Sequence, residues 1–132
     1  MSHSGQPNVI LCIDDQPIAL RTRQLILEHA GCCVLTATNG AAALELFRHE
    51  PVDLVITDHL LPGLTGSQVA AEMKRLKPEV PVALLSGLVE RPEGAEASDA
   101  SDAFLTKGIP VPEFLAAVAS LLRGPECQPD RR

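Results

Sequence analysis

Five short apolar runs are spaced along the chain, separated by polar residues, glycine and proline. Each run is too short for a buried helix and several are rich in β-branched residues, which is typical of strands buried on both faces of a sheet. We therefore predict strands at residues 8–13, 32–37, 53–57, 80–85 and 104–106.

The longer segments between these runs place apolar residues at helical spacing. The first helix is predicted to begin near Pro17, whose ring is tolerated in a first turn, and to end at Gly31. Other helices are predicted at 41–49, at about 67–77, and from Pro110 or Pro112 onward. The apolar positions expected to face the core are Ile18, Ala19, Leu25 and Ile26 in the first helix, and Phe114, Leu115, Val118, Leu121 and Leu122 in the last.

Strands that alternate with helices in this way indicate an α/β fold, in which about five helices cover a doubly wound parallel sheet of five strands. One stretch, 91–101, combines proline, glycine, small residues and acids, so we expect a short or mobile segment there instead of a regular helix. A single domain is predicted over 8–123, with polar tails at 1–7 and 124–132.

Composition narrows the classes of function. The 132 residues carry a net charge of −6, which argues against direct binding of nucleic acid or of an anionic membrane. Trp and Tyr are absent, so a site built on aromatic stacking is disfavoured. No apolar run has the length of a membrane span, and residues 1–7 lack the pattern of a secretory signal. We expect a cytoplasmic protein. Of its four cysteines, Cys12, Cys32 and Cys33 lie in or beside apolar runs and are expected to be reduced packing residues.

Chemically active side chains follow the ends of the predicted strands. Asp14 and Asp15 follow the first strand, Asp58 the third, Ser86 the fourth and Lys107 the fifth. Because the carboxyl ends of parallel strands meet at one edge of a sheet, three carboxylates and one ammonium are expected to converge there. Three carboxylates repel each other unless a cation offsets their charge, and a hard, oxygen-loving ion such as Mg²⁺ suits them.

With the segment Leu61-Pro62-Gly63-Leu64-Thr65-Gly66 behind Asp58, and with Phe104 three residues before Lys107, the chain closely resembles the receiver domain of two-component response regulators. The resemblance covers about residues 8–122. It implies a flavodoxin-like sheet with strand order 2-1-3-4-5.

The resemblance also implies roles for individual residues. Asp58 is the expected acceptor of a phosphoryl group from a sensor histidine kinase or a histidine phosphotransfer protein, which makes the chain a signalling module and not a turnover enzyme. Lys107 and Ser86 are expected to contact the phosphoryl group, and Phe104 to switch inward when Ser86 moves. Mg²⁺ is expected to be held by the carboxylates of Asp15 and Asp58, by Asp14 through a water, and by the backbone carbonyl of Leu60.

The expected readout surface is the fourth helix, fifth strand and fifth helix, and the output partner is unknown; a homodimer formed on phosphorylation is one candidate. Two departures from the family pattern bear on the chemistry. Gly108 stands where the family usually has a proline, which predicts a softer loop beside Lys107. Leu60 and Leu88 are apolar at the positions that tune the lifetime of the phosphoryl group, which predicts slow self-dephosphorylation.

Other interpretations remain open at this point. The chain could be a phosphate-independent interaction module with the same fold, and an enzyme for a free phosphorylated metabolite would need a second general base that the sequence does not identify. Asp14 and Asp15 could merely cap the following helix, and Ser86 could be only a turn residue. His59 is interpreted as a loop side chain without a metal or catalytic role.

Overall fold

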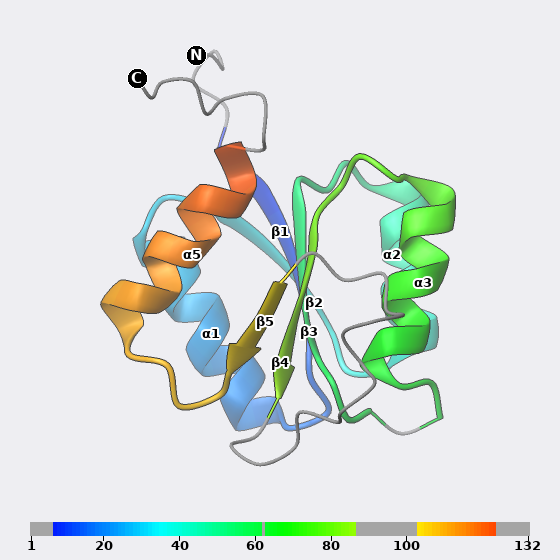
Figure 1. Ribbon diagram of the computed structural model, residues 1–132, viewed down its shortest axis with the longest axis horizontal. Coiled ribbons are helices and arrows are strands. Elements are labelled where there is room, and N and C mark those ends of the chain that lie inside the picture. The colour runs from blue at the N-terminus through cyan, green and yellow to red at the C-terminus, as the bar shows by residue number, and fades with distance from the viewer. Residues whose placement is uncertain (1–6, 62, 87–102, 124–132) are drawn as a thin grey trace.

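The computed structural model describes residues 7–61, 63–86 and 103–123. Five parallel strands form one sheet in the order β2-β1-β3-β4-β5, which confirms the predicted topology (Figure 1). The strands are β1 (Val9–Ile13), β2 (Cys33–Ala37), β3 (Leu54–Asp58), β4 (Val82–Ser86) and β5 (Ala103–Thr106).

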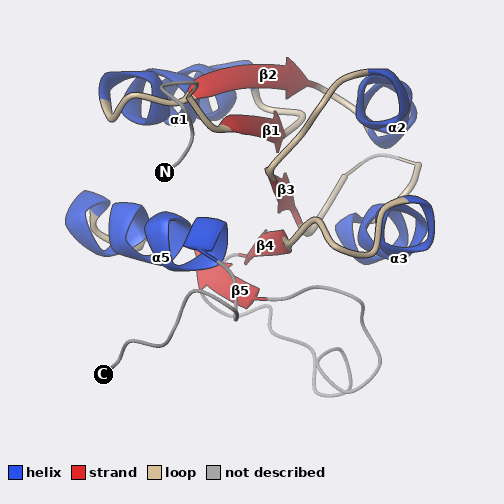
Figure 2. Cartoon of the chain, turned by 90° about the horizontal axis from the view of Figure 1, so that it is seen from above, coloured by secondary structure: helices blue, strands red, loops and turns tan. Residues whose placement is uncertain are grey.

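Helices cover both faces of this sheet. Figure 2 shows α1 and α5 on one face and α2 and α3 on the other. The described helices are α1 (Pro17–His29), α2 (Gly40–His49), α3 (Gly66–Leu76) and α5 (Val111–Arg123), and their ends agree with the predicted ones within two residues. The irregular stretch at 91–101, the predicted C-terminal tail and nearly all of the predicted N-terminal tail lie outside the described residues.

The two faces of the sheet have separate cores, because successive side chains of a strand point to opposite sides. Leu11 and Ile13 of β1 pack in the core formed with α2 and α3. Ile10 and Cys12 pack in the core formed with α1 and α5. Burial on both faces explains why the strands are continuous apolar runs instead of alternating ones.

Side chains at the helix starts explain where α2 and α3 begin. The Asn39 side chain accepts a hydrogen bond from the backbone N–H of Ala42 at the start of α2. Thr65 and Gln68 form a reciprocal capping box at the start of α3. Each cap satisfies backbone donors that have no partner inside the helix, which fixes the first turn.

The predicted apolar face of α1 is wrong in part. Ile18 and Leu25 are 82% and 50% exposed, whereas Leu20 and Leu27 are buried against the sheet. Burial follows the three- and four-residue spacing from Leu20 to Leu27, and that face of the helix also contains Arg23. Because apolar residues occur all round α1, only the packing decides which of them are covered.

The cysteine prediction is also wrong in one place. Cys33 is exposed on β2, an edge strand, while Cys12 is buried and Cys32 is half-buried. All three described cysteines are free. Burial raises the pKa of the Cys12 thiol to about 12, so this side chain stays protonated and inert.

The face of α1 can be tested with two matched truncations. Leu27→Ala is expected to destabilise the protein by about 2–5 kcal/mol, because it opens a cavity in the core. Leu25→Ala is expected to cost less than about 1 kcal/mol, because half of that side chain is in solvent. Urea unfolding followed by far-UV circular dichroism measures both, and similar losses for the two variants would contradict this orientation.

Candidate functional site

The register of the sheet brings the predicted side chains to one edge. Ile13, the last residue of β1, pairs with Thr57, so Asp14 lies beside Asp58 at the ends of adjacent strands. The next pair along β3 and β4 is Asp58 with Leu85. Ser86 pairs with Thr106, and Lys107 follows directly on β5. The parallel pairing therefore assembles groups from four separate parts of the chain.

Three carboxylates meet at this edge. One ligand oxygen each from Asp14, Asp15 and Asp58 lies within 4.8 Å of the others. Asp14 and Asp58 are 0% and 3% exposed, and Asp15 is the most exposed of the three. Oxygen ligands crowded in this way fit a hard divalent cation such as Mg²⁺, because such an ion offsets their mutual repulsion.

Asp58 also has a cationic partner, which follows the end of β5. Lys107 Nζ lies 3.0 Å from Asp58 Oδ1, and the backbone N–H of Leu60 donates to the same carboxylate. Burial raises the pKa of Asp58; the hydrogen bond from Lys107 lowers it, the charge of Asp14 raises it, and the net shift is upward. Ionised Asp58 is therefore a costly group in the folded protein unless more positive charge arrives.

Asp14 is held by two donors. The backbone N–H of Gln16 donates to Oδ1 at 2.9 Å, and Arg23 Nη2 donates to Oδ2 at 3.2 Å. The Arg23 side chain is 12% exposed and comes from α1. Arg23 is not among the residues predicted from the sequence, although its position between Leu20 and Leu27 on one helical face was a usable signal.

Gly66 lets the start of α3 approach the backbone of Asp58 closely. A Cβ atom at this position would lie 2.4 Å from the backbone oxygen of Asp58, closer than any side chain permits. The backbone N–H of Gly66 donates to the carbonyl of His59 at 2.9 Å, and that of His59 donates to Leu85 at 2.8 Å. The chain just after Asp58 is thus fixed from both sides.

The remaining predicted residues lie around this centre. Ser86 is 2% exposed at the end of β4, and its carbonyl accepts a hydrogen bond from the backbone N–H of Lys107 at 2.8 Å. The Phe104 ring on β5 is half-buried and lies edge-on to His59, with ring centroids 6.3 Å apart. The Leu60 side chain is 58% exposed. Leu88 lies outside the described residues.

Comparison with known sequences identifies the family. The sequence model of the response regulator receiver domain matches residues 10–119. The chain belongs to this family. It is 30% identical over 122 residues to the probable transcriptional regulatory protein TcrX of Mycobacterium tuberculosis, and 36% identical over 110 residues to the transcriptional regulatory protein GlrR of Escherichia coli.

The matches cover different shares of each protein. They include 90% and 83% of this chain but only 51% of TcrX and 24% of GlrR, so the chain spans about half of one relative and about a quarter of the other. A 36% identity over 106 residues to the sensor histidine kinase GacS of Pseudomonas protegens covers 76% of this chain and 12% of that kinase. Receiver domains thus occur in both partners of two-component signalling, and they are signalling modules and not turnover enzymes.

Solved structures agree with this assignment. The response regulator TrrA from Thermotoga maritima, solved in complex with Mg²⁺ and BeF, is similar with a TM-score of 0.80 and 31% identity, over 86% of this chain and 98% of that one. A receiver domain protein from Clostridium thermocellum gives a TM-score of 0.81 at 28% identity, over 88% and 94%. Within the described residues, every helix is too short or too polar to cross a membrane.

The raised pKa of Asp58 predicts a pH-dependent stability. The folded state binds this proton more tightly than the unfolded chain, so the contribution of Asp58 is fully present below its unfolded pKa and is lost as the pH rises through its folded pKa. Asp58→Asn removes this loss of stability at high pH, because asparagine does not ionise. The variant leaves Lys107 without its carboxylate partner, but this side chain is 38% exposed and can be solvated by water. In EDTA the variant is expected to be more stable than wild type near about pH 7, with a difference that shrinks toward about pH 4. Urea unfolding at several pH values measures this, and a difference independent of pH would contradict it.

Two glycine substitutions test the close approach at α3. Gly66→Ala is expected to destabilise the protein by about 1–3 kcal/mol, because the new methyl group meets backbone atoms that cannot move aside cheaply. Gly108→Ala is the matched control, since a Cβ there would meet nothing within 4 Å. Thermal unfolding followed by circular dichroism compares them, and equal melting temperatures would show that α3 does not lie this close to Asp58.

Proposed function

We propose that this receiver is a phosphorylation-controlled signalling module in which Asp58 accepts a phosphoryl group from a sensor histidine kinase or a histidine phosphotransfer protein. The observation that carries the proposal is the surroundings of Asp58. This nearly buried carboxylate lies beside two others and is paired with Lys107 at 3.0 Å. A carboxylate nucleophile with an ammonium group and metal-ligating oxygens close to it suits phosphoryl transfer, because positive charge offsets the charge of the transferring group.

In this proposal an oxygen of Asp58 attacks the phosphorus atom of a phosphohistidine on the partner. The phosphorus–nitrogen bond breaks, the imidazole keeps the electron pair, and an aspartyl-phosphate forms on Asp58. Lys107 moves from the Asp58 carboxylate to a phosphoryl oxygen, and the Leu60 N–H keeps the carboxylate oriented. Asp15, Asp58 and the Leu60 carbonyl would hold Mg²⁺, with Asp14 acting through a water. The bound ion would supply positive charge that offsets the charge of the transferring group.

The output is proposed to follow from a local change at the neighbouring strands. The Ser86 hydroxyl is expected to donate to the phosphoryl group, which releases Phe104 to turn inward from its contact with His59. The surface altered is then β5 and α5, and the fourth helix of the sequence-based expectation lies outside the described residues. A second copy of this chain, bound on phosphorylation, is one candidate for the output partner.

One observation favours the alternative of a phosphate-independent interaction module. Asp14 is already paired with a cation of the protein, Arg23, at 3.2 Å. A site that neutralises its own acids could keep the receiver fold without taking up metal or phosphate.

Intact mass spectrometry separates the two functions. The protein is incubated with acetyl phosphate or phosphoramidate, with Mg²⁺ or with EDTA, as wild type, Asp58→Asn and the matched control Asp53→Asn, which changes an acid just before the same strand. A gain of about 80 Da that needs Mg²⁺, persists in Asp53→Asn and is absent in Asp58→Asn is expected.

Failure to gain mass in a folded wild-type protein would leave the interaction module as the better proposal. After removal of the phosphodonor, the same sample reports how long the modification lasts. The apolar residues at 60 and 88 predict slow loss, and decay within seconds would contradict that part.

A further inference from the structure

The ion pair between Arg23 and Asp14 places a cation of the protein inside the acidic site. Arg23 Nη2 lies 3.2 Å from Asp14 Oδ2, the Asp14 side chain is 0% exposed and that of Arg23 is 12% exposed. This is a buried pair and not a surface one, so solvent and salt screen it little.

The surroundings of Arg23 suit an aliphatic side chain better than a guanidinium. The residue lies on the face of α1 that buries Leu20 and Leu27 against the sheet. Its Nη1 atom is buried and has no hydrogen-bond partner among the described residues. An unsatisfied buried donor is unfavourable, so burial by itself does not favour an arginine here. The favourable interaction of Arg23 at this position is its ion pair with Asp14.

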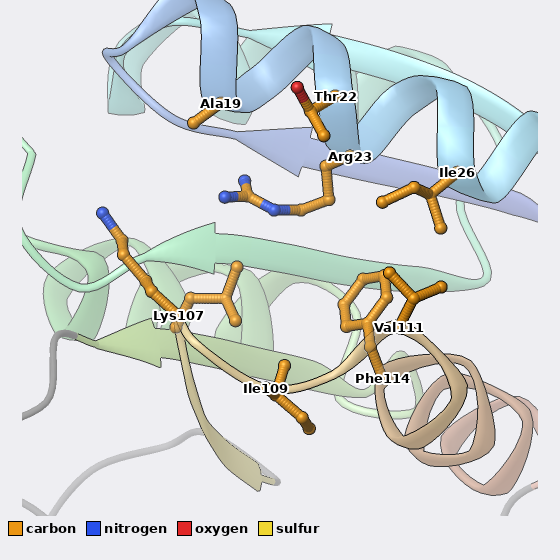
Figure 3. Close-up of a pocket in the computed structure, with 9 residues that line it drawn as sticks. Ala19, Thr22, Arg23, Ile26, Lys107, Ile109, Val111 and Phe114 are labelled. Carbon is orange, nitrogen blue, oxygen red and sulfur yellow. The ribbon is translucent and has the colours of Figure 1, made fainter.

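A cavity beside Arg23 gives its side chain another place to go. A space of about 310 Å³ lies between α1 and the segment that leads into α5, lined by Arg23, Lys107, Ile26, Ile109, Val111 and Phe114 among others. Figure 3 shows the cationic ends of Arg23 and Lys107 at one end of this pocket and Ile26, Val111 and Phe114 at the other.

We propose that Arg23 is a built-in counter-ion of Asp14 that competes with Mg²⁺ and sets a weak affinity of this receiver for the metal. This inference rests on the proposed function, because it concerns the Mg²⁺ site that phosphoryl transfer would use. Among the described residues, the three carboxylates and the two cations at the site sum to a formal charge of −1, and without Arg23 the same set carries −2. When Asp14 takes part in metal binding, the Arg23 guanidinium separates from it and moves into the cavity between α1 and α5.

The expected size of the effect follows from Coulomb's law. Even in the dielectric of bulk water, a unit positive charge a few ångströms from a divalent ion lowers its affinity by about tenfold. The Arg23–Asp14 ion pair must also break before Asp14 can take part in metal binding, and the free energy needed to break it lowers the Mg²⁺ affinity further.

Isothermal titration of Mg²⁺ into the full chain at fixed ionic strength tests the proposal. This readout needs neither phosphorylation nor tryptophan fluorescence, which a chain without Trp cannot supply. Arg23→Gln is expected to bind Mg²⁺ about tenfold tighter than wild type. Arg23→Lys keeps the charge and is expected to stay close to wild type. Arg21→Gln is the control for net charge, because Arg21 is exposed on the same helix. It is expected to change the Mg²⁺ affinity by less than about twofold.

Thermal unfolding gives a second reading on the same variants. Without metal, Arg23→Gln is expected to melt below wild type, because Asp14 is left buried without its cation. With saturating Mg²⁺ it is expected to gain more in melting temperature than wild type does.

The outcomes are distinct. Equal or weaker Mg²⁺ binding by a folded Arg23→Gln overturns the inference and leaves the proposed function standing. A gain in affinity as large in Arg23→Lys as in Arg23→Gln also overturns it, because the charge would then not be the cause. Absence of Mg²⁺ binding in wild type and in every variant overturns the proposed function together with this inference.

Discussion

Crowding of negative charge at a buried sheet edge is the constraint on which the rest of this structure depends. Asp14 and Asp58 follow adjacent strands, are almost fully removed from solvent, and have Asp15 beside them. Each ionised carboxylate raises the cost of ionising the next, and burial adds to that cost. The surrounding donors reduce it, and the upward shift in the pKa of Asp58 shows that they do not remove it.

The fold supplies this arrangement through backbone geometry more than through side chains. Parallel pairing puts the ends of β1, β3, β4 and β5 at one edge, and the two apolar cores hold the strands in register. Gly66 permits backbone contact behind Asp58, so the segment after Asp58 is tied to both α3 and β4. A rigid edge of this kind keeps charged groups close together although they repel each other.

Two cations of the protein pair with these acids, each from a different element. Lys107, from the end of β5, pairs with Asp58 and is 38% exposed, so it can exchange partners readily. Arg23, from α1, pairs with Asp14 and is enclosed. The resting site is therefore less acidic than its three carboxylates suggest. Under the proposal that Arg23 competes with Mg²⁺, metal affinity depends on the strength of this internal ion pair as well as on the ligands.

The residue pattern predicts the order of the strands and helices along the chain and their limits within two residues. It also predicts the edge at which Asp14, Asp58, Ser86 and Lys107 meet. These features were predictable because apolar runs, breakers and strand ends are local, and parallel strands share one carboxyl edge. Only the tertiary structure decided which side of α1 is buried, that Arg23 reaches Asp14, and that Cys33 is exposed. Each of these depends on how one element packs against others far away in the chain, and local spacing does not contain that information.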